Sequence, residues 1–398
     1  MKSNAMVQKT RWGIVVLLIF TGMLAAFQVG KAAIAVPALR DDLGMSLLAA
    51  SWIVGALGAL GAAIALPAGL VLSLFPARRT LIVGLVAIGA GSIAGALTDS
   101  GSVLLATRII EGFGFICTIL SAPHLFRLVT AERDNALAFA FWGAYMPLGS
   151  AIMMLAGPLL IAYFGWQGLW LFNGLLPLAY AAVVARLDIP NETIPAANRN
   201  LLTNLREGFR AAGPVLLGAA FGLYTFQYFA LSSLFPALLV ERLGISIAAA
   251  GLISAGTVLA NAVGNFAAGA LLRLGVPLWS ILAGCFVASS IFAFGIFSAG
   301  LPVAAVAALA AVSLAVTGLV PASLFAAAPM IAPSSAQLAI ALGLLTQIGI
   351  SGQLLGPTVL AAFVERYDWS VAPVVFLGAT IAGLAVALAL RMVLRKRA

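Results

Sequence analysis

The sequence predicts an all-α membrane protein with twelve transmembrane helices in two six-helix halves, related by pseudo-two-fold symmetry, and with both termini in the cytoplasm. Two compositional observations lead to the membrane class. Only 8% of the 398 residues are charged and 63% are hydrophobic, whereas soluble proteins carry about 25% charged residues. Apolar runs recur along the whole chain, and a hydrocarbon core of about 30 Å needs about 20 such residues in a helix. An internal repeat, described below, predicts the two halves.

The predicted spans are apolar runs between breaks that are charged or rich in Pro, Gly and Asn. They cover residues 13–39, 46–73, 80–98, 102–127, 135–163, 167–187, 213–239, 246–272, 278–299, 302–327, 337–363 and 370–391. They lack the period-two alternation of outer-membrane strands, and the first run is too long for a cleavable signal peptide. One long polar segment, residues 186–213, separates the first six spans from the last six. It divides the chain into an N-terminal half (1–187), a cytoplasmic linker (188–212) and a C-terminal half (213–398).

The distribution of Lys and Arg predicts the orientation. With the N-terminus inside, the inner segments hold sixteen basic residues, and the outer connections hold only Arg40, Arg242 and Arg366. Because cytoplasmic connections are enriched in Lys and Arg, we expect both termini in the cytoplasm. We expect the protein to be a multi-pass protein of the inner (plasma) membrane. The net charge of +9 does not indicate nucleic acid, because the basic residues stand singly or in pairs between spans.

An internal repeat relates the two halves. "FQVGKAAIAVPALRDDLGMS" begins at Phe27 and "FQYFALSSLFPALLVERLGIS" begins at Phe226, and one inserted residue shifts the spacing from 199 to 200. Matching pairs continue the relation: Gly69 with Gly269, and Gly157-Pro158 with Gly356-Pro357. Parallel repeats of six spans are a known transporter architecture, with the substrate site near mid-membrane between the halves.

Three charged residues lie within the predicted spans and away from the span ends: Lys31, Arg108 and Glu111. A lysine near the centre of a membrane helix costs about 2.5–3.5 kcal/mol on insertion scales, so Lys31 should face the bundle interior. One hypothesis makes its compact ammonium an anchor for an anionic substrate. The alternative pairs Lys31 structurally with Glu111.

Arg108 and Glu111 stand three residues apart and therefore share a helix face. Together with Lys31 they would put two cations and one anion in one pocket, a net positive charge that suits an anionic ligand. Glu111 is the one carboxylate predicted inside the membrane, which makes it the candidate proton carrier. The alternative is a structural Arg108–Glu111 pair.

Uncharged polar residues in the spans predict the lining of a polar cavity. They are Gln28, Tyr145, Tyr224, Gln227, Tyr228, Asn261, Asn265 and Gln347. Each could instead hydrogen-bond between helices as structural glue. Cys117 and Cys285 are expected to pack as small apolar residues, and His124 as a packed residue. With one histidine and one buried acid, we expect neither a metal site nor a cofactor.

Several stretches resemble the major facilitator superfamily over all twelve spans. "RIIEGFG" (108–114) is similar to its fourth-span motif, and "FGWQGLWLFN" (164–173) to the aromatic stretch before span six. "GLVLSLFPARRT" (69–80) lies where the family has its loop signature, but Ser73 and Pro76 replace the usual aspartate and glycine. The antiporter signature of span five is present only at Gly157-Pro158. A basic residue in span one, before a proline-containing end, resembles the cyanate-permease-like branch, which moves small anions or small polar organics.

These features together predict a secondary transporter and not an enzyme. It would move a small anionic solute by alternating access, coupled to protons, as a monomer in the lipid bilayer. The resemblance implies that Arg108 also bears on proton coupling. The main alternative is a drug:proton antiporter that exports lipophilic cations. A second alternative is a transporter-like sensor that binds solute without moving it. We find no nucleotide-binding motif of the form G-x-x-x-x-G-K-[ST].

Overall fold

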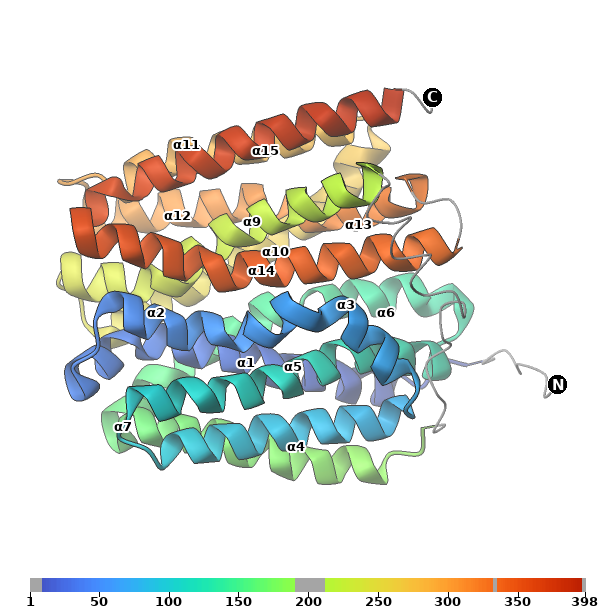
Figure 1. The fold of residues 1–398 in the computed structure, drawn as a ribbon, viewed down its shortest axis with the longest axis horizontal. Helices are drawn as coiled ribbons and strands as arrows, with labels where there is room; N and C mark the ends of the chain where they lie inside the picture. The colour runs from blue at the N-terminus through green and yellow to red at the C-terminus, as the bar shows by residue number, and fades with distance from the viewer. Residues whose placement is uncertain (1–8, 190–211, 332–334, 396–398) are drawn as a thin grey trace.

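The computed structural model describes residues 9–189, 212–331 and 335–395, and its elements are helices (Figure 1). A segment that crosses a bilayer must satisfy its own backbone hydrogen bonds, and an α-helix does so. The first elements, here called the N-terminal group, are α1 (Trp12–Leu43), α2 (Leu47–Gly55), the 3₁₀ turn η1 (Ala56–Gly58), α3 (Ala59–Ser73), α4 (Ala77–Ala96), α5 (Gly101–Val129), η2 (Glu132–Asp134), α6 (Asn135–Gly143) and α7 (Tyr145–Arg186).

The remaining elements, here called the C-terminal group, lie in the upper part of Figure 1. They are α9 (Ala212–Ala237), the π turn η3 (Leu238–Arg242), α10 (Ile247–Arg273), α11 (Leu278–Ile296), α12 (Val303–Thr317), α13 (Leu319–Ile331), α14 (Ser335–Tyr367), η4 (Trp369–Val371) and α15 (Ala372–Arg395). Most of the expected linker, residues 190–211, lies outside the described residues.

Eleven helices of the described chain are long and apolar enough to cross a membrane. The spans expected at 46–73, 135–163 and 302–327 are not continuous α-helices. Residues 56–58 tighten into a 3₁₀ turn, Ala144 separates α6 from α7, and Gly318 separates α12 from α13. Apolar composition did not reveal these interruptions, because they contain the same small and apolar residues as the helices around them.

Helix α7 contains a chain reversal at Gly165, which has φ 68° and ψ 178°. Before it, Gly149 lies against Ala26 and Gly157 against Ile34, so this segment follows α1 in the same direction. After it, the Trp166 indole donates to Asp42 at 2.6 Å, and the Tyr180 hydroxyl donates to the Leu17 carbonyl at 2.8 Å. The part of α7 before Gly165 therefore runs parallel to α1, and the part after Gly165 runs antiparallel to it.

The ends of α1 and α9 share one capping pattern, at the place where the sequence repeats. Gly44 and Gly244 follow them in the left-handed conformation, at φ 61° and 66°. Ser46 and Ser246 then cap the next helices, their hydroxyls accepting hydrogen bonds from the third residue on. The inserted residue of the second copy falls in the π turn η3, which absorbs one extra residue in a helix.

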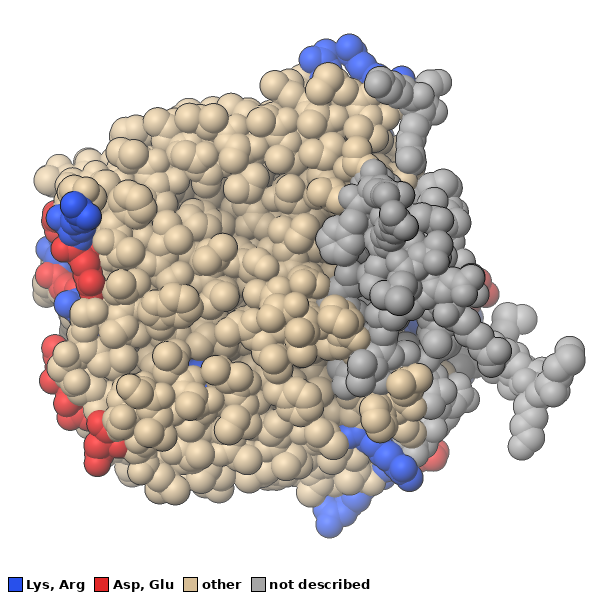
Figure 2. Space-filling view, viewed as in Figure 1, with Lys and Arg blue, Asp and Glu red and all other residues tan. Residues whose placement is uncertain are grey.

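Charged side chains gather at the two ends of the bundle on the face shown in Figure 2, and its middle is almost entirely uncharged. The start of α1 and the end of α15 lie at the same end of the bundle, here called the terminal end. The opposite end is here called the acidic end. It carries six acidic residues and three arginines: Asp41, Asp42, Asp99, Glu241, Glu365 and Asp368, with Arg40, Arg242 and Arg366. The uncharged middle is the part of the surface that suits lipid.

The two groups of helices touch closely along α7 and α10. A Cβ added at Gly251 of α10 would stand 2.3 Å from the Met154 carbonyl and 2.7 Å from the Pro158 ring of α7. Small residues allow membrane helices to approach each other in this way.

Candidate functional site

Lys31, Arg108 and Glu111 form a buried ionic triad, and each has a side-chain exposure of 0%. They are the charged residues among the buried side chains of the described chain. Lys31 Nζ lies 3.0 Å from Glu111 Oε1, and Arg108 pairs with the other carboxylate oxygen. The triad carries a net charge of +1, and the predicted burial of Lys31 is observed.

Lys31 meets three helices of its own group. Its ammonium donates to Ser92 Oγ of α4 at 2.6 Å and to Glu111 of α5. It also lies 4.7 Å from the ring centroid of Trp170 in α7, a cation–π distance. Ser92 in turn donates to the Trp170 carbonyl at 2.7 Å. In this state the ammonium is therefore buried among the helices of the N-terminal group.

Arg108 is held mainly by backbone. Its Nε donates to the Ile53 carbonyl of α2 at 2.8 Å, and its second terminal nitrogen donates to the Gln28 carbonyl of α1 at 2.9 Å. The remaining partner is Glu111. The guanidinium thus ties α1, α2 and α5 together, so the structural Arg108–Glu111 pairing is present.

Gln28 lies one turn before Lys31, and its side chain also approaches α7. Its side-chain nitrogen donates to the Leu24 carbonyl at 3.1 Å and approaches the Asn173 carbonyl at 3.5 Å. Gln28 Oε1, Asn173 Oδ1 and Trp170 Nε1 are buried and have no hydrogen-bond partner among the described residues. Two consecutive turns of α1 therefore oppose two turns of α7 across a polar but desolvated contact.

The C-terminal group has its own polar cluster. The Tyr224 hydroxyl and the Asn261 side chain lie 3.2–3.3 Å apart, and Asn265 donates to Asn261 Oδ1 at 3.1 Å. Tyr228 packs beside Tyr224, with 5.8 Å between ring centroids. Gln227, the repeat counterpart of Gln28, donates to Thr380 Oγ1 of α15 at 3.1 Å.

Tyr145 and Gln347 lie apart from both clusters. Tyr145 stacks on Trp142, with 4.5 Å between ring centroids. Gln347 of α14 donates to the Ala62 and Ala63 carbonyls of α3, and so links the two groups of helices. The predicted lining residues therefore have separate neighbours in this state. Their role in binding stays a prediction.

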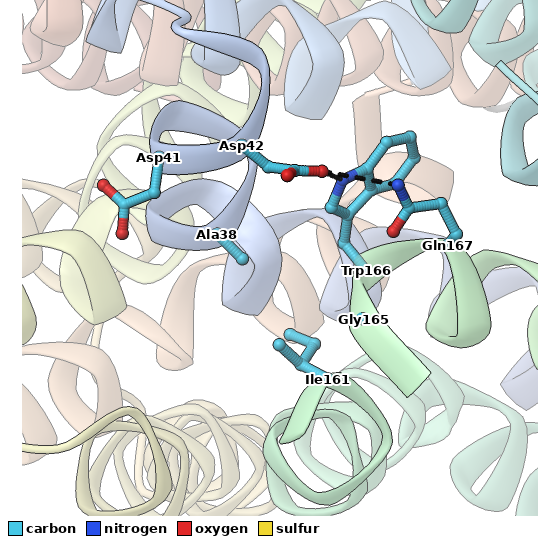
Figure 3. A pocket seen from close by; sticks show the side chains of 7 residues that line it. All are labelled: Ala38, Asp41, Asp42, Ile161, Gly165, Trp166 and Gln167. Carbon is cyan, nitrogen blue, oxygen red and sulfur yellow. Dashed lines mark hydrogen bonds between the residues drawn. The ribbon is translucent and has the colours of Figure 1, made fainter. Parts of the chain in front are cut away.

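Two shallow recesses open at the acidic end. The first, about 480 Å³, is lined by Ala38, Asp41, Asp42, Ile161, Gly165, Trp166 and Gln167. Figure 3 shows Asp42 of α1 accepting hydrogen bonds from Trp166 and Gln167, which holds the end of α1 against the reversal of α7. The second, about 570 Å³, lies between Arg40 and Glu241 and shares Asp41 with the first.

Sequence reasoning missed Ser92, Trp170, Asn173 and Thr380. Ser92 stands in a run of small residues, "GAGS", where a hydroxyl looks like ordinary packing. Trp170 and Asn173 are spaced one turn apart in span six, a signal that could have marked them as a polar face. Among residues 9–189, 212–331 and 335–395, no group of three or more His, Cys, Asp or Glu is placed to hold a metal ion.

These features define a class of protein: a polytopic α-helical membrane protein with an ion-paired cluster buried between its helices. The sequence model of the Major Facilitator Superfamily matches residues 18–223, more than half of the chain. The chain belongs to the major facilitator superfamily, whose members are transporters and not enzymes.

Several curated relatives match about half of the chain. The methylenomycin A resistance protein of Bacillus subtilis (strain 168) is 27% identical over 197 residues, which cover 48% of this chain and 41% of the relative. The puromycin resistance protein pur8 of Streptomyces alboniger is 29% identical over 182 residues, 46% and 36% of the two chains. The 4-hydroxybenzoate transporter PcaK of Pseudomonas aeruginosa (strain PAO1) is 28% identical over 180 residues, 44% and 39%. The chain thus spans about two fifths of the length of the relatives it matches.

Solved structures match nearly the whole chain at low identity, which shows a shared fold. A bacterial homolog to the human lysosomal transporter Spinster, in an inward-facing and unoccupied conformation, superposes with a TM-score of 0.72 at 13% identity, covering 96% of this chain and 95% of the other. A D-xylose-proton symporter superposes with a TM-score of 0.71 at 15% identity, covering 95% and 96%.

Proposed function

We propose that this chain is a secondary active transporter that works by alternating access between two six-helix halves, residues 1–187 and 213–398. Twelve spans follow if the two arms of α7 on either side of Gly165 are counted separately. The shared capping pattern after α1 and α9 supports the pseudo-two-fold relation of the halves. A substrate path near mid-membrane between the halves is the arrangement expected for parallel repeats.

The proposed substrate is a small anion, and the net charge of the triad carries this proposal. Lys31, Arg108 and Glu111 sum to +1 and are fully buried. A charge about 10 Å away interacts with that surplus by about 1.7 kcal/mol at an effective dielectric constant of about 20. An anion near mid-membrane is therefore favoured over a cation even before direct contact. This preference agrees with the cyanate-permease-like branch, to which we assign the chain.

In this proposal Lys31 contacts the anion, with Arg108 contributing charge. The pocket is shaped by Gln28, Tyr145, Tyr224, Gln227, Tyr228, Asn261 and Gln347. Reaching Lys31 requires rearrangement, because the ammonium now faces α4, α5 and α7. Glu111, with Arg108 beside it, is the proposed proton-coupling site, and a D-xylose-proton symporter shares the fold.

The proposed setting is the inner membrane, with both termini in the cytoplasm and the chain acting as a monomer. The six carboxylates of the acidic end would then face outward. The arginines that lie near the described ends of the chain, such as Arg11 and Arg395, would face the cytoplasm.

Export of lipophilic cations is the second candidate. The resistance proteins of Bacillus subtilis and Streptomyces alboniger support it, since they match about half of the chain at 27% and 29% identity. The triad argues against it, because a net positive cluster repels cations. The relative named for 4-hydroxybenzoate transport, a carboxylate, matches at a similar 28%.

Counterflow in liposomes separates the candidates. Purified protein is reconstituted with unlabelled benzoate or tetraphenylphosphonium inside, and entry of the labelled ion is followed. We expect protein-dependent benzoate exchange, reduced at least tenfold in Lys31→Met. Exchange of tetraphenylphosphonium alone would make drug export the function. Stabilisation by benzoate without any exchange would favour a sensor.

A further inference from the structure

The buried triad carries one positive charge more than it can pair internally. Lys31 and Arg108 share the single carboxylate of Glu111, and all three side chains are 0% exposed. The other buried side chains of the described residues are uncharged. A buried charge without a partner is unfavourable, so such a cluster gains stability from one further negative charge.

The two cations differ in what binds them. Arg108 donates to the backbone carbonyls of Ile53 and Gln28, and its departure would leave both carbonyls buried without those donors. Lys31 is held by Glu111, by the Ser92 hydroxyl and by the face of Trp170. A lysine ammonium has three rotatable donors on a flexible stem. Lys31 is therefore the cation that can exchange its carboxylate partner.

We propose that the site selects singly charged anions, with the anion replacing Glu111 at Lys31 while Glu111 stays on Arg108. This inference rests on the anion transport proposed above and adds the valence of the substrate. After the exchange, Lys31 pairs with the anion and Arg108 pairs with Glu111, so the cluster is neutral. A doubly charged anion would leave a buried surplus of −1, and a neutral solute would leave +1 unpaired.

A charge ladder of variants tests the valence. The probes are sodium benzoate and sodium phthalate, which share a ring and differ by one carboxylate, and binding is measured by thermal stabilisation of the purified full chain at constant ionic strength. Wild type (+1) should prefer benzoate at least tenfold. Glu111→Gln (+2) should lose that preference or reverse it, because one charge about 10 Å away changes affinity roughly tenfold.

Two further variants bring the triad region to zero net charge. Lys31→Met removes the cation, and Ser92→Asp adds a carboxylate where the ammonium now donates to a hydroxyl at 2.6 Å. Both should lower benzoate affinity at least tenfold, and either variant suffices if the other does not fold. Ser290→Ala, a buried serine of the C-terminal group, is the matched neutral control and should keep the wild-type ratio.

The outcomes separate this inference from the proposed function. Equal benzoate-to-phthalate ratios in wild type, Glu111→Gln and Ser92→Asp would overturn the valence inference and leave anion transport standing. If no anion either stabilised the wild-type protein or showed counterflow, the proposed function itself would be overturned. A benzoate-to-phthalate ratio that changes with the net charge of the triad as expected supports both the valence inference and anion transport.

Discussion

At the scale of single residues, Lys31 is tolerated in the membrane because its ammonium is surrounded by suitable partners. Glu111 supplies the charge, Ser92 an acceptor and Trp170 the negative face of a ring. Ser92 has a double role, since it accepts from Lys31 and donates to the Trp170 carbonyl. A hydrogen bond to a charged group contributes about 1.5–3 kcal/mol, about twice a neutral one.

Ser92→Ala should therefore destabilise the protein. It removes the acceptor of a buried ammonium and leaves the Trp170 carbonyl without its hydroxyl donor, at a cost of about 2 kcal/mol. We expect the apparent Tm in detergent to fall by a few degrees. Ser102→Ala, an exposed serine of α5, is the control and should stay within about 0.5 kcal/mol of wild type. Equal Tm values for the two variants would contradict the role of Ser92.

The triad was predictable from sequence, whereas its surroundings were not. A charge inside an apolar run is rare and expensive, so Lys31, Arg108 and Glu111 stand out without any structure. Serine, tryptophan and asparagine also occur in spans for ordinary packing, so Ser92 and Asn173 gave no comparable signal. Their relevance depends on which helices are neighbours, and apolar periodicity does not specify this.

At the scale of the helix, the reversal in α7 depends on one glycine. Gly165 has φ 68° and ψ 178°, a region of conformational space that is essentially restricted to glycine. Asp42 then holds the following residues, Trp166 and Gln167, through hydrogen bonds of 2.6 and 3.3 Å. The sequence predicted a break here, between the spans expected at 135–163 and 167–187. The π turn η3 after α9 was visible only as an inserted residue in the repeat.

Gly165→Ala should cost about 1–3 kcal/mol, because alanine must adopt a strained backbone conformation at this reversal. Gly256→Ala is the matched control. It lies inside α10, where a Cβ meets nothing within 4 Å, and should be neutral or stabilising by up to about 1 kcal/mol. Thermal unfolding of both variants in one detergent checks the pair. The prediction fails if Gly165→Ala is as stable as Gly256→Ala.

At the scale of the whole molecule, polar contacts join the two groups of helices at the acidic end. Arg40 of α1 pairs with Glu241, which lies in the π turn that follows α9. Glu365 of α14 accepts a hydrogen bond of 2.6 Å from the Leu48 backbone at the start of α2. A carboxylate at a helix N-terminus is favoured by the helix dipole. Composition predicted which residues lie at this end, but the pairing across groups depends on the tertiary arrangement.

Under the proposed alternating access, these contacts would favour a state that is closed at the acidic end, so weakening them should populate a state that is open there. The partly exposed Arg40–Glu241 ion pair contributes about 0–1 kcal/mol, and the hydrogen bond from Leu48 to Glu365 contributes a similar amount. Arg40→Ala with Glu365→Gln should therefore shift the balance only modestly. Spin labels on Ser100→Cys and Ser298→Cys, exposed positions in opposite groups at this end, report the opening as a longer distance in pulsed electron resonance. Cys117 and Cys285 are buried, which limits background labelling.

Arg242→Ala is the matched control for this measurement. Arg242 lies at the same end, but it donates to the Phe297 carbonyl within its own group at 2.8 Å. Its loss removes a similar charge without cutting a link between the groups, so the distance distribution should match the parent. If Arg242→Ala lengthened the distance as much as the double variant, loss of an arginine at this end, and not loss of a link between the groups, would explain the opening. If neither variant lengthened it, apolar packing such as Gly251 against Met154 and Pro158 would be sufficient to keep this end closed.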